Sequence, residues 1–116
     1  MTMQTRFIDV GSEFGPRLAN RDSTQGDGKF TALTFRREYL SELDNREFWA
    51  HAVDHFITLD FSKVSKIGPS FANEAFAYFT QYAKPDVILR VIRIQHATKV
   101  QKMIIEYELW SGYSGQ

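Results

Sequence analysis

Apolar positions along the chain follow two different repeats, and each repeat predicts one kind of element. Four segments are short, apolar and rich in β-branched or aromatic residues, which is typical of buried strands. We predict strands over residues 6–10, 29–33, 56–61 and 86–95. Elsewhere apolar residues recur every three or four positions, which predicts amphipathic helices. We predict these helices over residues 34–43, 69–84 and 96–107.

Strands and helices alternate from residue 29 onward, and this order favours the α/β class. We predict a single-domain α/β sandwich, with a mixed β-sheet and helices packed mainly on one face. Residues 1–28 hold the first strand and an irregular loop, because the loop is rich in glycine and small polar residues. Residues 29–110 form the α/β core, and residues 111–116 form a flexible tail.

Two of the predicted helices carry clear apolar stripes. Pro69 suits the first turn of its helix, where a backbone donor is not needed. The stripe behind it consists of Phe71, Ala72, Ala75, Phe76, Phe79 and Ala83. In the last helix an amphipathic stripe has the spacing i, i+3, i+4, i+7. Its members are Val100, Met103, Ile104 and Tyr107.

Charged and polar aromatic residues flank these stripes. Arg36 and Arg37 are most simply a solvated helix face beside two glutamates. Arg90 and Arg93 should point to opposite faces of their predicted strand, one of them to the face without helices. Two further aromatic residues, four positions apart on the second helix, could contact a partner or cover a sheet edge. They are Tyr78 and Tyr82.

Composition narrows the function classes. Of the 116 residues, 43% are hydrophobic and ten are phenylalanine, which predicts a Phe-rich core. Fourteen basic residues balance fourteen acidic ones, and this neutrality argues against a nucleic-acid-binding protein. The lack of cysteine excludes disulfides, thiolate catalysis and cysteine-ligated metals. No apolar stretch approaches the roughly 18 residues of a membrane span, so we expect a cytoplasmic protein.

The segment from Leu59 to Glu74 carries the most informative pattern. An apolar strand ends in Asp60, a short polar crossing follows, and a helix begins with Ser70 in its first turn. A hydroxyl at the positive end of a helix dipole suits phosphate chemistry or the docking of an anionic group. The same hydroxyl also suits a plain helix cap, with Glu74 adding favourable charge in the first turn. Asp60 could likewise bind a partner or only bond the turn that follows it.

Other candidate motifs are weaker. The run Gly26–Lys29 is not a phosphate-binding loop, because Phe30 stands where serine or threonine is required. His51 and His55 have the spacing of two metal ligands on a helix, with Asp54 as a third candidate. They lead directly into a strand and lack the metalloprotease glutamate, so we expect no metal and no cofactor. Nothing in the spacing assembles a nucleophile, base and orienting acid, and we expect no enzymatic activity.

The stretch from Ile57 to Tyr107 resembles the STAS-like domain of unknown function, a bacterial relative of the STAS fold of anti-sigma-factor antagonists. The resemblance rests on a strand ending in Leu-Asp-Phe, a helix opening with Ser-Phe-Ala, and a last helix carrying Met-Ile. The corresponding segments here are LDFSKV, IGPSFANEAFAYF and VQKMII. The resemblance implies a STAS-like sandwich.

Anti-sigma-factor antagonists carry a phosphorylatable serine at the start of the helix after their Asp-ending strand. The resemblance therefore implies that Ser70 is a phosphorylation candidate and Asp60 the strand-end acid. It also implies a protein partner of the histidine-kinase-like ATPase or serine kinase class. This chain departs from the antagonist pattern Asp-Ser-Ser-Gly, because residues 68–71 read Gly-Pro-Ser-Phe. Asn73 replaces the aspartate of the STAS-like pattern.

Two functional hypotheses stay open. The first is a non-enzymatic regulatory module that docks a protein partner, with Ser70 as a phospho-switch. Its partner-binding residues are Asp60, Ser70, Asn73 and Glu74. The alternative is a sensor of a small molecule or nucleotide, bound between strand ends and helix N-termini. Its ligand-binding residues are Ser70, His96 and Thr98. A sheet edge, or the aromatic residues Trp110 and Tyr113, could support a homodimer.

Overall fold

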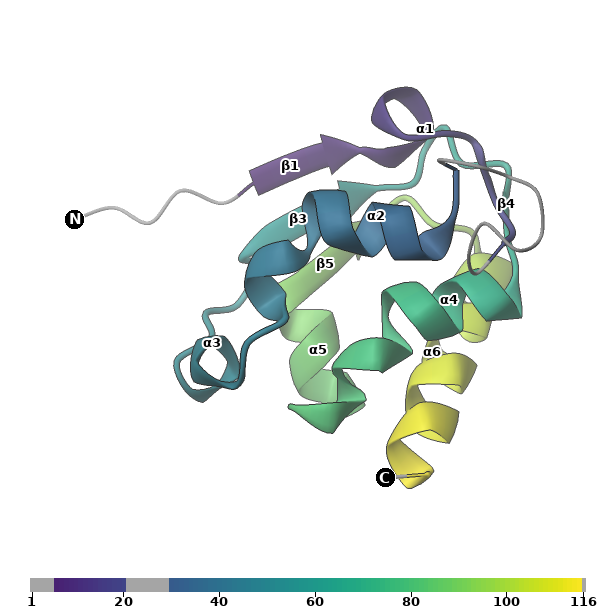
Figure 1. Ribbon diagram of the computed structural model, residues 1–116. Helices are drawn as coiled ribbons and strands as arrows, with labels where there is room; N and C mark the ends of the chain where they lie inside the picture. Colours follow the sequence, from purple (N-terminus) through teal and green to yellow (C-terminus); the bar gives the residue numbers. More distant parts are fainter. Residues whose placement is uncertain (1–5, 21–29, 116) are drawn as a thin grey trace.

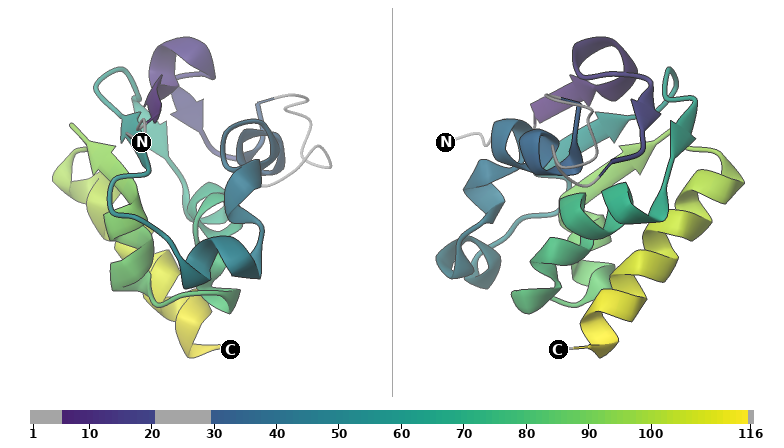
Figure 2. Two further views of the ribbon diagram at one scale, coloured as in Figure 1. Left: turned by 90° about the vertical axis from the view of Figure 1, so that its left-hand side faces the viewer. Right: turned by 45° about the vertical axis from the view of Figure 1, so that its right-hand side comes forward.

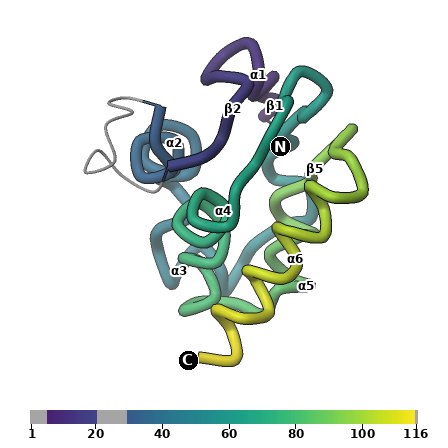
Figure 3. The backbone as a smooth tube through the Cα atoms, turned by 90° about the vertical axis from the view of Figure 1, so that its right-hand side faces the viewer, coloured from purple at the N-terminus to yellow at the C-terminus, as the bar shows by residue number. Residues whose placement is uncertain are grey.

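A three-stranded parallel sheet forms the centre of the protein (Figure 1). The computed structural model describes residues 6–20 and 30–115. The strands of this sheet are β1 (Arg6–Asp9), β3 (Ile57–Asp60) and β5 (Ile92–Gln95), in the order β1-β3-β5. A second, two-stranded parallel sheet pairs β2 (Arg17–Leu18) with β4 (Lys66–Ile67), and Figure 3 shows these two segments side by side.

Helices connect the parallel strands. In chain order the α-helices are α1 (Val10–Glu13), α2 (Ala32–Tyr39), α3 (Arg46–Ala50), α4 (Pro69–Ala75), α5 (Pro85–Val91) and α6 (Lys99–Ser114). Two 3₁₀ helices complete the described part, η2 (Ser41–Leu43) and η3 (Ala77–Gln81). Figure 2 shows α2 and α3 on one side of the molecule, and α5 and α6 on the other.

The predicted α/β fold of a single domain is confirmed, with one difference in the sheet. All described strand pairs are parallel, whereas we had expected a mixed sheet. Along β3, Ile57 and Leu59 point to the same face and are fully buried. On the other face, the register aligns Phe7, Thr58 and Arg93, and both edge residues of this row are exposed. Arg93 thus lies on the face that is not buried in the core.

Phenylalanines fill the core, as their number predicted. The fully buried ones are Phe35, Phe61, Phe71, Phe76 and Phe79. Phe35 of α2 lies 5.7 Å, between ring centroids, from Phe71 of α4, and Phe14 packs edge-on against both rings. Such tilted and edge-on pairs are favourable beyond their buried area. They attach the two helices to each other and to the loop after α1.

The helices begin in two different ways, with a side-chain cap or with a proline in the first turn. Side chains cap α2, α3 and α6, where Thr31, Asn45 and Thr98 accept hydrogen bonds from free backbone donors. In contrast, α4 and α5 have no side-chain cap and begin with Pro69 and Pro85. Proline fits the first turn because its fixed φ suits a helix and its missing N–H is not required there.

The strand predicted over residues 29–33 is wrong where the structure describes it. Thr31 is the N-cap of α2, and its hydroxyl accepts a hydrogen bond from Thr34 N at 3.3 Å. Helix α2 therefore begins at Ala32, inside the predicted strand. A local cap overrides the strand preference of a short apolar run. Lys29, and with it the run Gly26–Lys29, lies outside the described residues.

The strand predicted over residues 86–95 is half wrong. Pro85–Val91 form helix α5, and only Ile92–Gln95 form a strand. Arg90 accordingly lies on a helix, one turn after Asp86, and not on a strand face opposite Arg93. The helical signal within this β-branched run is a set of side chains buried at three-residue intervals, namely Pro85, Ile88 and Val91.

The last helix is longer than predicted, and its stripe faces outward. Helix α6 extends to Ser114, so most of the expected flexible tail is helical. Its buried residues are Gln101, Ile105 and Leu109. Three of the four stripe residues, Val100, Met103 and Tyr107, are exposed instead. The loop expected over residues 11–28 likewise contains α1 and β2 in its described part.

Within residues 6–20 and 30–115, no helix combines the length and the apolar character that crossing a membrane requires.

Candidate functional site

Asp60 lies at the carboxyl end of the central strand and bonds the turn that follows. Its Oδ1 accepts a hydrogen bond from Ser62 N at 2.9 Å, and its Oδ2 accepts one from the Ser62 hydroxyl at 3.1 Å. This is the turn-capping role that a strand-end aspartate often takes. In the parallel register Asp60 is aligned with Asp9 of β1, whose carboxylate lies 3.3 Å from Lys63 Nζ.

His96 is the second partner of Asp60. It follows β5 with a left-handed φ of 60°, which is uncommon for a residue other than glycine. Its Nδ1 lies 3.0 Å from Asp60 Oδ1, while most of its side chain is exposed. The Ser62 N–H and His96 together lower the pKa of Asp60 below its ordinary value of 3.8. The structure thus brings together Asp60, which was predicted to bind a protein partner, and His96, which was predicted to bind a small ligand.

Ser70 is the second residue of α4. The N-cap of this helix is Gly68, and the helix has no side-chain cap hydrogen bond. The Ser70 hydroxyl forms no hydrogen bond with another described residue, so the capping interpretation is not supported there. Ser70 is partly exposed. No hydrogen bond or ion pair within the described residues joins Ser70 to Asp60.

Asn73 and Glu74 point to different neighbours of α4. Asn73 Nδ2 donates to Glu108 Oε1 of α6 at 3.4 Å. Glu74 Oε2 accepts from Arg36 Nη2 of α2 at 2.9 Å. The carboxylate of Glu74 is therefore engaged within the fold, between two helices. The hydrogen bonds and ion pairs described here thus join Asp60, Asn73 and Glu74 each to a different neighbour: to Ser62 and His96, to Glu108, and to Arg36.

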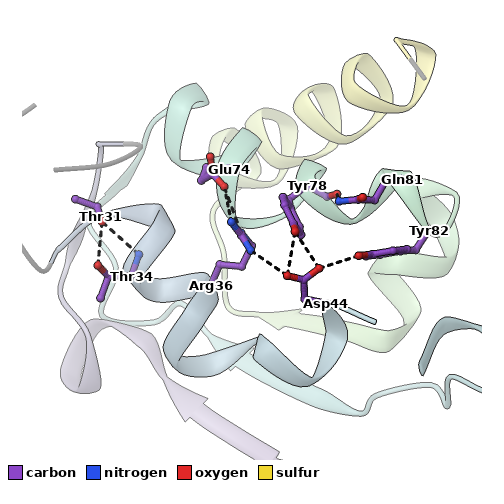
Figure 4. A network of polar contacts seen from close by, with 8 residues as sticks. All are labelled: Thr31, Thr34, Arg36, Asp44, Glu74, Tyr78, Gln81 and Tyr82. Carbon is purple, nitrogen blue, oxygen red and sulfur yellow. Dashed lines mark hydrogen bonds and ion pairs between the residues drawn. The ribbon is translucent and has the colours of Figure 1, made fainter. Parts of the chain in front are cut away.

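Sequence reasoning missed a polar network around Arg36 (Figure 4). Arg36 was expected on a solvated face, but its side chain is only 9% exposed, and its guanidinium lies 3.6 Å above the Tyr78 ring. Asp44, after η2, lies 3.7 Å from the same guanidinium and accepts hydrogen bonds from Tyr78 and Tyr82. Both tyrosines serve this internal network.

The network also shifts the titration of its tyrosines. Burial, and then the hydrogen bond to Asp44, raise the pKa of Tyr78 above its ordinary value. For Tyr82 the hydrogen bond to Asp44 is the larger cause of the raised pKa. Both phenols therefore stay protonated donors at neutral pH. The arrangement links α2 and the residue after η2 to α4 and η3.

The residues predicted to bind a small ligand, Ser70, His96 and Thr98, lie outside five cavities of the described surface. Thr98 caps α6, where its hydroxyl accepts from Gln101 N at 3.1 Å and the Gln101 side chain accepts from Thr98 N at 2.9 Å. Five surface cavities of about 230 to 460 Å³ are formed by described residues. None of these five has Ser70, His96 or Thr98 among its lining residues.

The three residues considered as metal ligands, His51, Asp54 and His55, each contact a different neighbour. His51 lies 3.7 Å from Glu47 of α3, and Asp54 lies 3.6 Å from Arg90 of α5. The backbone N–H of His55 donates to the Arg90 carbonyl, and His55 has a left-handed φ of 56°. Within residues 6–20 and 30–115, no three histidine or acidic side chains gather as ligands for a metal ion.

Comparison with known families identifies the sandwich. The family described as "STAS-like domain of unknown function (DUF4325)" matches residues 44–102, from Asp44 after η2 to the first turn of α6. The chain belongs to this STAS-like family. The match covers β3, α4 and β5, and with them Asp60, Ser70, Asn73, Glu74, His96 and Thr98. No curated protein and no solved structure matches the chain significantly.

Proposed function

We propose that this STAS-like domain is a non-enzymatic regulatory module that docks a protein partner, with Ser70 as its phosphorylation switch. The observation that carries the proposal is the state of Ser70. It is the second residue of α4, partly exposed, and its hydroxyl is not engaged by another described residue. The resemblance to anti-sigma-factor antagonists, which carry a phosphorylatable serine at the start of the corresponding helix, supports this choice of Ser70.

A phosphate on Ser70 would change the charge of this surface strongly. Phosphorylation adds roughly −1.5 to −2 charges and three acceptor oxygens. The start of a helix tolerates such a charge, because free backbone donors and the helix dipole favour an anion. A partner docked over Ser70 would meet a different surface before and after the modification. We propose a histidine-kinase-like ATPase or serine kinase as this partner.

The proposed docking surface centres on Ser70, since the other three candidates have partners within the fold. Asn73 donates a hydrogen bond to Glu108. Asp60 bonds Ser62 and His96, and Glu74 pairs with Arg36. Asp60 would contribute to docking indirectly, by holding the turn at Ser62 in place. Glu74 would also contribute indirectly, by fixing α4 against α2. None of the five cavities described above is lined by the three residues of the sensor alternative, and we do not pursue it.

The first test is the modification itself. Trypsin should release residues 67–90 as one peptide from protein isolated from its native cells, because Lys84 precedes proline. Ser70 is the only serine in this peptide. We expect mass spectrometry to find phosphoserine there under some growth conditions. Absence of phosphate under all conditions sampled would contradict the switch.

The second test is partner binding. We expect Ser70→Asp to change the dissociation constant of a partner captured from lysate by about tenfold, or about 1.4 kcal/mol, relative to Ser70→Ala. Ser41→Asp adds the same charge at an exposed position on η2 and serves as the matched control. Equal binding by both Ser70 variants would overturn the role of Ser70, whether or not a partner exists.

A further inference from the structure

Helix α6 presents an apolar face to solvent. This α6 stripe consists of Val100, Met103, Tyr107 and Trp110, whose exposed fractions are 65%, 59%, 70% and 50%. An aromatic side chain offers about 150–250 Å², so the stripe exposes roughly 400–500 Å² of mainly apolar surface. That is as large as the biggest apolar patch on an ordinary monomer, and such patches are often functional. Figure 2 shows α6 running along the outside of the molecule.

The stripe cannot turn inward. The opposite side of α6 holds Ile105 and Leu109, both at most 1% exposed, and rotating the helix would expel them from the core. Pro69 of α4 lies beside the stripe and helps to line an open groove of about 360 Å³. The other residues that line this groove are Val100, Met103, Ile104, Tyr107 and Glu108. The surface is therefore fixed, apolar and slightly concave.

We propose that the α6 stripe pairs antiparallel with the α6 stripe of a second copy of this chain. The spacing of the four residues is 3, 4 and 3, which reads the same in both directions. A two-fold axis that crosses the stripe at right angles to α6, at the level of residue 105, then places Val100 against Trp110 of the partner subunit. The same axis places Met103 against Tyr107 of the partner subunit. Each contact joins a smaller side chain to a larger one, which allows facing layers to interdigitate.

Charge favours the antiparallel arrangement over the parallel one. Lys99 and Lys102 lie in the first turns of α6, and Glu106 and Glu108 lie further along. This order is the reverse of what a helix dipole prefers, because cations are unfavourable at the N-terminus. An antiparallel second copy brings acidic residues to the basic half of each helix. A parallel copy would place like charges together.

The area is consistent with a reversible dimer. Two stripes, with Pro69 and Ile104 at the groove, would bury about 1,000 Å² in total, which is at the lower limit for a specific interface. An interface in which the same patch serves both subunits closes after two copies. We therefore expect a concentration-dependent dimer, monomeric at low concentration. This proposal does not rest on the role proposed for Ser70.

Sedimentation equilibrium of the full chain, from micromolar to millimolar concentration, tests the association. We expect the wild type to dimerise and Tyr107→Asp to remain monomeric. Phe7→Asp is the matched control, because Phe7 is also a largely exposed aromatic residue (58%, against 70% for Tyr107) and lies on β1. A wild-type chain that stays monomeric throughout would overturn self-pairing and leave the stripe for a different protein. If Tyr107→Asp did not weaken the dimer, the α6 stripe would not be its interface.

The lack of cysteine allows a direct test of orientation. We expect an oxidised mixture of Met103→Cys and Tyr107→Cys chains to form mainly the mixed disulfide, because only opposed residues come within disulfide distance. A parallel pair would instead give mainly self-linked dimers of Met103→Cys and of Tyr107→Cys, which would overturn the proposed axis. Far-ultraviolet circular dichroism confirms that each variant is folded, as expected for exposed positions.

Discussion

At the scale of single residues, the carboxylate of Asp60 links the turn after β3 to the residue that follows β5. It bonds the turn at Ser62 and meets His96 beyond the end of β5. These bonds favour the ionised carboxylate, which is why the pKa of Asp60 is lowered. The sequence predicted Asp60 and His96 as separate candidates, and their contact depends on the adjacent positions of β3 and β5 in the sheet.

The lowered pKa of Asp60 predicts a pH-dependent contribution to stability. A group whose pKa is lower in the folded state stabilises the fold fully above its unfolded pKa, and this contribution is lost as the pH falls through the folded value. We therefore expect Asp60→Asn to be less stable than the wild type at pH 7, and this difference to shrink at a pH well below 3.8. Urea unfolding at both pH values measures it. Asp54→Asn, at an exposed aspartate, is the control. If the stability difference between Asp60→Asn and the wild type did not change with pH, the stabilising role of the ionised Asp60 would be contradicted.

At the scale of elements, the contact between α2 and α4 depends on one ion pair in a mostly apolar interface. Arg36 of α2 and Glu74 of α4 have side chains only 9% and 19% exposed. Phe35 and Phe71 pack beside them on the same two helices. Removing one charge from such a pair leaves the other poorly solvated, which costs more than the pair itself contributes.

We expect Glu74→Gln to lower the free energy of unfolding by about 2–4 kcal/mol, because Arg36 then remains buried with a weaker partner. Glu42→Gln is a matched control, because Glu42 pairs with Arg6 in an exposed ion pair. Its cost should stay below about 1 kcal/mol. Chemical denaturation measures both variants. Equal, small costs would contradict a stabilising role of the Arg36–Glu74 pair.

At the scale of the whole molecule, the placement of α6 determines which of its faces is the surface. The pattern Val100, Met103, Ile104 and Tyr107 gave the stripe correctly as a feature of an amphipathic helix, but such a stripe usually marks the core face. In the structure α6 packs against α4 and η3 with the face that carries Ile105 and Leu109. Gly112 permits a close approach there, since a Cβ at this position would lie 3.0 Å from Ala77 Cβ.

This orientation predicts opposite outcomes for two substitutions on the same helix. Leu109→Ala should lower the free energy of unfolding by about 2–5 kcal/mol, because it leaves a cavity in the core. Met103→Ala should cost less than about 1 kcal/mol, because this side chain is largely exposed. Urea unfolding at low protein concentration, where the chain is monomeric, provides the comparison. A larger cost for Met103→Ala would show that the stripe faces the core.

Local signals account for both the correct and the wrong predictions of elements. Strand β3 and helix α4 were predicted because a compact apolar run is followed by Pro69 at a helix start. Helix α5 was missed because its Val, Ile and Leu residues have a high strand propensity. The signals for a helix were Pro85 at its first position and the i, i+4 pair of Asp86 and Arg90. Tertiary packing outweighed propensity in this segment.

The sequence by itself determined the α/β class, the Phe-rich core, the STAS-like resemblance and the position of Ser70 at the start of a helix. Each of these depends on composition or on residues close together in the chain. Only the tertiary structure decided which candidates meet and which surfaces remain open. It joined Asp60 to His96, enclosed Arg36 with Glu74 and Asp44, and turned the α6 stripe outward. These outcomes depend on packing between distant segments, which periodicity along one helix or strand does not contain.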